Sequence, residues 1–219
     1  MATDPSTVAV AQAAQQIALQ MLEERGRGAV LVGVARVDAA LEHLLQAVMA
    51  PATGKGDGLF LPDRPLGSLG AKVALARRLG LIDPAVERAL NALRKLRNAF
   101  AHSAESASLA DPTHSDRLAP IVADARTNPL WVPLDTVLAS QPPSGQGPLE
   151  PALRDYILLI TILVAFLEAT AQQLTPMLPP VVLGFSGITT SNKTAMASAP
   201  GIHKRRTSGK HATGSGPCC

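Results

Sequence analysis

The sequence predicts an all-α fold, a single bundle of about five to six helices with a disordered C-terminal tail. Two features indicate this fold class. Of the 219 residues, 47% are hydrophobic but only 3% are aromatic, which predicts a core of Leu, Ala and Val, and small or unbranched residues cost a helix little. Apolar residues also recur at spacings of three and four, whereas few runs alternate with a period of two. A chain of this length can bury one good core.

Apolar stripes place the helices along the chain. In the second and fourth predicted helices the stripes are continuous enough to define one buried face each, and they consist of Val30, Val34, Val37, Leu41, Leu44, Leu45 and Val48, and of Val86, Leu90, Leu93, Leu96 and Phe100. We expect six helices, over residues 7–24, 29–49, 68–79, 84–102, 115–125 and 150–174.

Local signals mark several helix ends. Ser68 is a suitable N-cap, and Gly80 suits the left-handed conformation that ends helices. Asp83 followed by Pro84 is typical of a helix start, because the first side chain caps and the second fits the first helical position. Residues 126–148 contain five prolines and predict an irregular segment.

Composition divides the chain into a helical domain over residues 1–180, with its best-defined core at about residues 20–105, and a disordered basic tail over 181–219. Residues 191–219 hold five Lys or Arg and no Asp or Glu, so the other 190 residues carry a net charge of −2 although the whole chain carries +3. A mildly acidic body argues against a domain-wide surface for DNA, which is normally basic.

The longest apolar run, Ile157–Leu167, is too short for a membrane span, which needs about 20 residues. We therefore expect a buried core helix there and no association with a membrane. The N-terminus shows no cationic region before an apolar one, so no signal peptide is expected. Cys218 and Cys219 are the only cysteines, which leaves the core without disulfides and favours a cytoplasmic location. These two terminal cysteines are similar to a double-prenylation end, but an incidental tail is the preferred interpretation.

Sequence signals for a cofactor or a metal are lacking. Gly54–Gly58 is similar to a phosphate-binding loop, but no Ser or Thr follows its lysine. The five histidines show no metal-ligand spacing. We expect neither a cofactor nor a metal site.

Two groups of polar residues stand out. In Arg97–His102, Asn98 and His102 share one helix face, whereas Arg97 and His102 are about 140° apart on an ideal helix and converge only if both flank a groove or the helix unwinds. Asp38 and Lys72 each lie beside an apolar stripe, where a buried charge needs a partner. These residues predict a structural polar cluster of Asp38, Lys72, Arg97, Asn98 and His102. The alternatives are a lysine that snorkels to solvent and a helix end whose cation complements the helix dipole.

The order of these elements resembles the mannitol operon repressor family. The matching segments are Arg27–Val30, Val37–Leu41, Leu59–Phe60, Pro65–Lys72, Leu79–Ile82 and Lys95–His102, within residues 20–105. The resemblance implies a helical fold and a regulatory role, without a recognised DNA-binding motif in the family's domain.

The helix end Arg-Asn-x-x-x-His also resembles the signature of the HEPN superfamily, many members of which cleave RNA without a metal at a dimer interface. The resemblance implies three catalytic residues: Arg97 would stabilise phosphate charge, His102 would act as acid or base on the ribose 2′-OH, and Asn98 would position them. Other relatives keep the motif for structure alone.

Two functional hypotheses follow. The first is a non-enzymatic transcriptional regulator that acts through protein–protein contacts. The second is a HEPN-like ribonuclease, such as a component of a toxin–antitoxin pair. The acidic body favours the first, since RNA-cleaving domains usually need cationic grooves, although Arg94, Lys95 and Arg97 cluster locally. We expect a protein partner and consider a homodimer. A repressor that binds DNA directly ranks third: the basic tail could contact nucleic acid, but nucleic acid is not directly indicated and no helix-turn-helix is evident.

Overall fold

The computed structural model describes residues 5–24, 26–52, 57–102, 107–140, 149–179, 181–185 and 187–190. The chain divides into two compact units, residues 1–177 and 178–219, and each is described by itself. This boundary lies three residues before the predicted one at 180.

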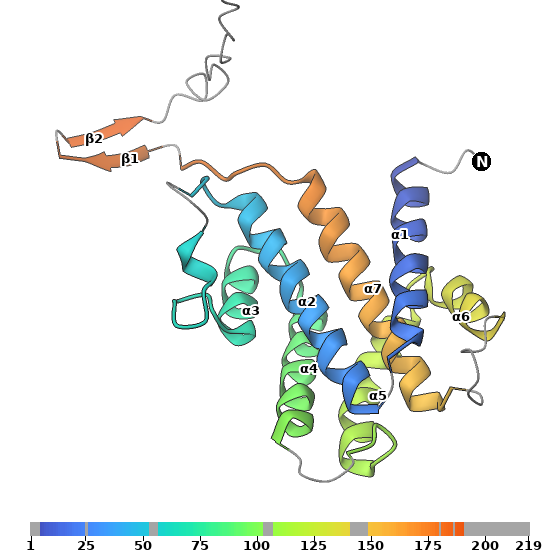
Figure 1. Cartoon of the computed structure of the whole chain (residues 1–219). Coiled ribbons are helices and arrows are strands. Elements are labelled where there is room, and N and C mark those ends of the chain that lie inside the picture. The colour runs from blue at the N-terminus through green and yellow to red at the C-terminus, as the bar shows by residue number, and fades with distance from the viewer. Residues whose placement is uncertain are drawn as a thin grey trace, which may run out of the picture. The chain divides into compact units, whose positions relative to one another are not determined.

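The described part of the first unit is an all-α bundle, as predicted (Figure 1). It holds one 3-10 turn, η1 (Gly58–Phe60), and seven α-helices: α1 (Pro5–Leu22), α2 (Gly26–Val48), α3 (Leu69–Arg78), α4 (Pro84–His102), α5 (Pro112–Arg126), α6 (Trp131–Ser140) and α7 (Pro151–Gln173).

Helix α7 forms the centre of the bundle. Thirteen of its residues are buried, and it packs against α1, α2, α5 and α6. Figure 1 shows α2 and α7 side by side, with α1 along α7 as well. The run Ile157–Leu167, predicted to be a core helix, lies inside α7 and is buried except at Phe166. Among the residues that the structure describes, no helix is long and apolar enough to cross a membrane.

A glycine allows α2 and α7 to approach closely. The hydroxyl of Tyr156 in α7 is buried and donates a hydrogen bond to the carbonyl oxygen of Val30 in α2, at 3.0 Å. A Cβ atom on Gly33 would lie 2.5 Å from that hydroxyl oxygen, so no other residue fits there unless the Tyr156 side chain or one of the helices shifts. Burial raises the pKa of Tyr156 far above its ordinary value, because the ionised phenol would lose its hydration.

The expected helix ends are present around α3 and α4. The hydroxyl oxygen of Ser68 accepts from the backbone N–H of Ala71 at 3.2 Å, and the Asp83 carboxylate accepts from the N–H of Val86 at 2.8 Å. Gly80, after α3, has a φ of 72°. These contacts satisfy N–H groups that the first helical turn leaves without an internal partner.

Helix α6 lies in the segment that the prolines predicted to be irregular. Pro133 falls within its first turn, where a missing backbone N–H costs no helical hydrogen bond. Trp131, Leu134 and Leu138 bury their side chains in the core. The apolar spacing in this segment outweighed the proline content.

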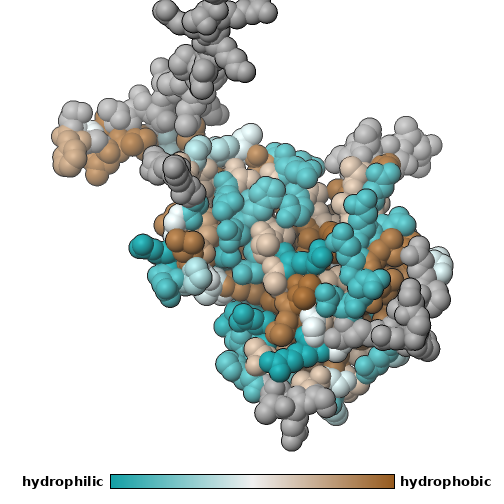
Figure 2. Space-filling model, in the orientation of Figure 1, coloured by the Kyte–Doolittle hydropathy of each residue, from teal (hydrophilic) through white to brown (hydrophobic). Residues whose placement is uncertain are grey.

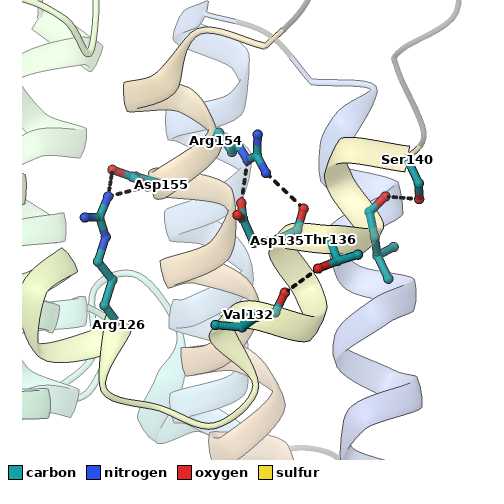
Figure 3. A network of polar contacts seen from close by, with 8 residues as sticks. Arg126, Val132, Asp135, Thr136, Ser140, Arg154 and Asp155 are labelled. Atoms are coloured by element: carbon teal, nitrogen blue, oxygen red, sulfur yellow. Dashed lines mark hydrogen bonds and ion pairs between the residues drawn. The ribbon is translucent and has the colours of Figure 1, made fainter.

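Polar contacts at the surface fasten α5 and α6 to α7 (Figure 3). The Arg154 guanidinium donates to the Asp135 carboxylate, and also to the Asp135 carbonyl oxygen at 3.0 Å. One guanidinium nitrogen of Arg126 lies 3.1 and 2.9 Å from the two carboxylate oxygens of Asp155. Such partly exposed pairs orient helices but stabilise them by only about 0–1 kcal/mol each.

In the second unit, an antiparallel hairpin joins β1 (Val181–Gly184) and β2 (Gly187–Thr190). These strands lie in the segment predicted to be a disordered tail. Residues 191–219, with Cys218 and Cys219, lie outside the described residues.

Candidate functional site

Lys72 of α3 is a buried cation held between two carboxylates of α2. Its side chain is 4% exposed, and its Nζ donates to Asp38 Oδ1 at 2.9 Å and to Glu42 Oε2 at 2.7 Å. The same Nζ lies 5.9 Å from the centre of the Phe60 ring, within range of a cation–π attraction. Lys72 therefore does not extend into solvent, and it joins α3 to α2. We call Asp38, Glu42 and Lys72 the ionic cluster.

The surroundings of Lys72 favour its charged form. Burial lowers the pKa of Lys72, but the hydrogen bonds and charges of Glu42 and Asp38 outweigh burial and raise it above the ordinary value of 10.5. Lys72 stays protonated at neutral pH.

The end of α4 keeps regular helical geometry through its last residue, His102. Arg97 and His102 therefore remain about 140° apart around the helix axis. The side chains of Arg97, Asn98 and His102 are all exposed, and Arg97 donates to the Asn98 side-chain oxygen at 3.4 Å, the long limit of a hydrogen bond. The alternative in which the helix unwinds at His102 does not occur.

A pocket of about 580 Å³ opens between α2, the start of α3 and α4. Its polar lining includes Asp38, Ser68, Arg94, Arg97 and Asn98, and its apolar lining consists of Leu31, Val34, Ala35, Leu69 and Ala101. We call this the α2–α4 pocket. Asp38 belongs to both the pocket and the ionic cluster, so it connects the two. His102 is not among the lining residues.

The loop before α3 closes the rim of the α2–α4 pocket. Backbone hydrogen bonds fold it tightly, from Leu66 N–H to the Leu59 carbonyl at 3.0 Å and from Gly67 N–H to the Arg64 carbonyl at 2.9 Å. A Cβ on Gly67 would lie 2.2 Å from the Leu61 carbonyl oxygen, so this position requires glycine. The tight loop fixes where α3 begins and hence where Lys72 enters the core.

The predicted polar cluster thus divides into separate parts. Asp38 and Lys72 are bonded to each other, and Arg97 and Asn98 are bonded to each other. Among the described residues, no side-chain hydrogen bond joins these two pairs, and none is made by the His102 ring. The α2–α4 pocket brings Asp38, Arg97 and Asn98 together without direct bonds.

Glu42 and Arg94 are the residues that sequence reasoning missed. Glu42 follows Asp38 by four residues, so both lie on one helix face, and this spacing was the available signal. Arg94 shows no sequence signal beyond its place among basic neighbours. In the structure, its Nε atom is buried and has no hydrogen-bond partner among the described residues.

Metal binding finds no support in the described part of the chain, where no group of three or more His, Cys, Asp or Glu residues could hold an ion. No protein-family model matches the sequence, and the searches of curated proteins and of solved structures found no match either. The resemblances to the mannitol operon repressor and HEPN families therefore stay predictions from the motifs.

Proposed function

We propose that the chain is a non-enzymatic, cytoplasmic regulator of transcription that acts through protein–protein contacts, as its resemblance to the mannitol operon repressor family implies. The observation that carries this proposal is the regular course of α4 to His102. An acid–base histidine and a phosphate-stabilising arginine must converge on one substrate group. With about 140° between them on one helix, Arg97 and His102 of a single copy do not converge.

The surface around α4 suits a protein partner. Interfaces between proteins combine apolar area with a polar rim and are enriched in arginine. Figure 2 shows hydrophobic surface among hydrophilic side chains on the face where α2 lies. Leu31 and Ala35 of α2, with Arg97 and Asn98 of α4, provide such a combination at the α2–α4 pocket.

The ionic cluster contributes to this role by joining two of the helices that line the pocket. It ties α3 to α2 through Lys72, which is almost fully buried. Helix α4 packs against both α2 and α3, so its exposed side chains lie on ordered helices and a partner would not lose affinity by ordering them. Under this proposal, Asp38 and Lys72 have a structural role, and Arg97 and Asn98 contact the partner.

A HEPN-like ribonuclease is the second candidate, and one observation favours it. Arg97, Asn98 and His102 are all exposed at one helix end, where a second copy could approach. Across a twofold axis, the histidine of one copy could meet the arginine of the other. This candidate requires a homodimer.

The two candidates differ in what they do to RNA in cells. RNA is sequenced, for abundance and for new 5′ ends, from cells that make the full chain, the Arg97→Ala/Asn98→Ala variant or the control Lys95→Ala. The proposal expects a defined set of transcripts to change in abundance with the wild type and the control but not with the variant. New internal 5′ ends that appear with the wild type and the control but not with the Arg97→Ala/Asn98→Ala variant would overturn it and support the ribonuclease.

A further inference from the structure

The α2–α4 pocket contains two arginines that no carboxylate neutralises. The described residues form seven ion pairs, and neither Arg94 nor Arg97 takes part in any of them. Asp38 also lines the pocket, but its carboxylate is bound to Lys72. Two guanidinium groups in a concave site favour the binding of an anionic ligand.

Arg94 is the less exposed of these two arginines, and the neighbouring helix fixes its position in the pocket. Its Nε–H is buried without a hydrogen-bond partner among the described residues, and an unpaired buried donor is unfavourable. Its side chain runs beside Gly70, where a Cβ would lie 3.5 Å from Arg94 Cδ. The start of α3 thus holds Arg94 at the pocket wall.

We propose that the α2–α4 pocket binds a small organic phosphomonoester, with Arg94 and Arg97 on the phosphate. A phosphomonoester carries a charge of about −1.5 to −2 at pH 7 and has three acceptor oxygens. It therefore suits two guanidinium groups better than a ligand with a single carboxylate would. Arginine binds such groups through paired N–H donors. The proposal goes beyond the regulatory function: both use Arg97 at this pocket, but binding of a phosphomonoester is measured without any partner.

The rest of the pocket limits the body of the ligand. A volume of about 580 Å³ is within the range of sites for small molecules. Leu31, Val34 and Ala35 offer an apolar wall on α2. The carboxylate of Asp38 excludes a second anionic group near it, which favours a monoester with an uncharged, partly apolar body over a polyphosphate or a nucleic acid.

Phenyl phosphate is a suitable probe, because it combines a phosphomonoester with a small apolar body. Calorimetric titration of the full chain at low salt is expected to give saturable binding of phenyl phosphate, weaker binding of inorganic phosphate and none of phenol. Arg94→Gln and Arg97→Gln are each expected to weaken phenyl phosphate binding at least tenfold. Lys95→Gln, with the same change of charge on the same helix, is the matched control and should bind as the wild type does.

The apolar wall is tested separately. Leu31→Ser should weaken the binding of phenyl phosphate but leave the binding of inorganic phosphate unchanged. Thermal melting checks that each variant folds, and Arg97→Gln, at an exposed position, keeps the test available if Arg94→Gln does not fold.

Three results would overturn the proposal. The first is absence of phenyl phosphate binding at millimolar concentration. The second is equal loss of binding in Lys95→Gln and Arg97→Gln, which would indicate general charge attraction. The third is binding of single-stranded RNA through Arg97 that phenyl phosphate does not displace, which would assign the arginines to nucleic acid.

Discussion

The buried ammonium of Lys72 lies 2.7 Å from the carboxylate of Glu42, one helical turn beyond Asp38 on the same face of α2. This contact makes the ionic cluster a three-residue unit, and the cluster shares Asp38 with the lining of the α2–α4 pocket. Its consequences for stability can be measured without knowledge of the function.

Replacement of Lys72 by Met should destabilise the fold. The substitution keeps an unbranched side chain only one atom shorter but leaves Asp38 and Glu42, whose side chains are 34% and 31% exposed, as two unpaired like charges. Because water can still reach both carboxylates, we expect a loss of about 2 kcal/mol, less than the 3–5 kcal/mol of a fully buried pair. Urea unfolding at pH 7 measures it. The control Lys95→Met should lie within about 0.5 kcal/mol of the wild type, and an equally small effect of Lys72→Met would contradict a structural role.

The contribution of Lys72 should depend on pH in one direction. Its folded-state pKa is raised above the ordinary value of 10.5, so the folded state retains the proton more strongly than the unfolded chain does. The resulting stability is fully present below about pH 10.5 and decreases as pH rises through the folded-state pKa. The difference in unfolding free energy between wild type and Lys72→Met should therefore be constant from pH 7 to pH 9 and shrink above pH 10.5. A difference that grows at alkaline pH would contradict the assignment.

Gly33→Ala should destabilise the contact between α2 and α7. The new Cβ would lie 2.5 Å from the Tyr156 hydroxyl oxygen, and overpacking costs about 1–3 kcal/mol, against which alanine gains up to about 1 kcal/mol of helix propensity. We expect a net loss of up to about 2 kcal/mol in urea unfolding. Gly28→Ala is the control, because a Cβ there meets the flexible Glu24 carboxylate at 3.3 Å; it should be neutral or stabilising.

Tyr156→Phe tests the same contact from the other side. It removes the hydrogen bond to the Val30 carbonyl oxygen and should cost about 1 kcal/mol at pH 7. In the double variant with Gly33→Ala, the two losses should sum to more than the observed loss, because the hydroxyl is one of the atoms that the new Cβ meets. Strict additivity would show that Gly33 and Tyr156 do not interact.

Local signals explain why much of the fold could be predicted. The capping residues Ser68 and Asp83 and the terminal Gly80 act over a few residues, and the structure places all three where the sequence indicated. Helix α6 was not predicted, because the five prolines of residues 126–148 indicated an irregular segment. Pro133 lies in the first turn of α6, where proline is tolerated.

The site was predicted less completely, since it depends on how helices pack. Asp38 and Lys72 were expected to need partners, and they bind each other. That Glu42 joins them, and that Arg94 rather than His102 lines the pocket, follows from the tight loop before α3 and its packing on α2 and α4. Helical spacing alone shows which residues share a face, but it does not show which face meets which helix.

The most direct test of the central claim, that the chain regulates by binding and does not cleave RNA, is a cleavage assay. The full chain and the Arg97→Ala/His102→Ala variant are incubated with structured RNA in the presence of EDTA, at protein concentrations high enough to allow a dimer. We expect intact RNA with both proteins, and equal thermal melting points because these side chains are exposed. Cleavage by the wild type, absent with the variant, would contradict it.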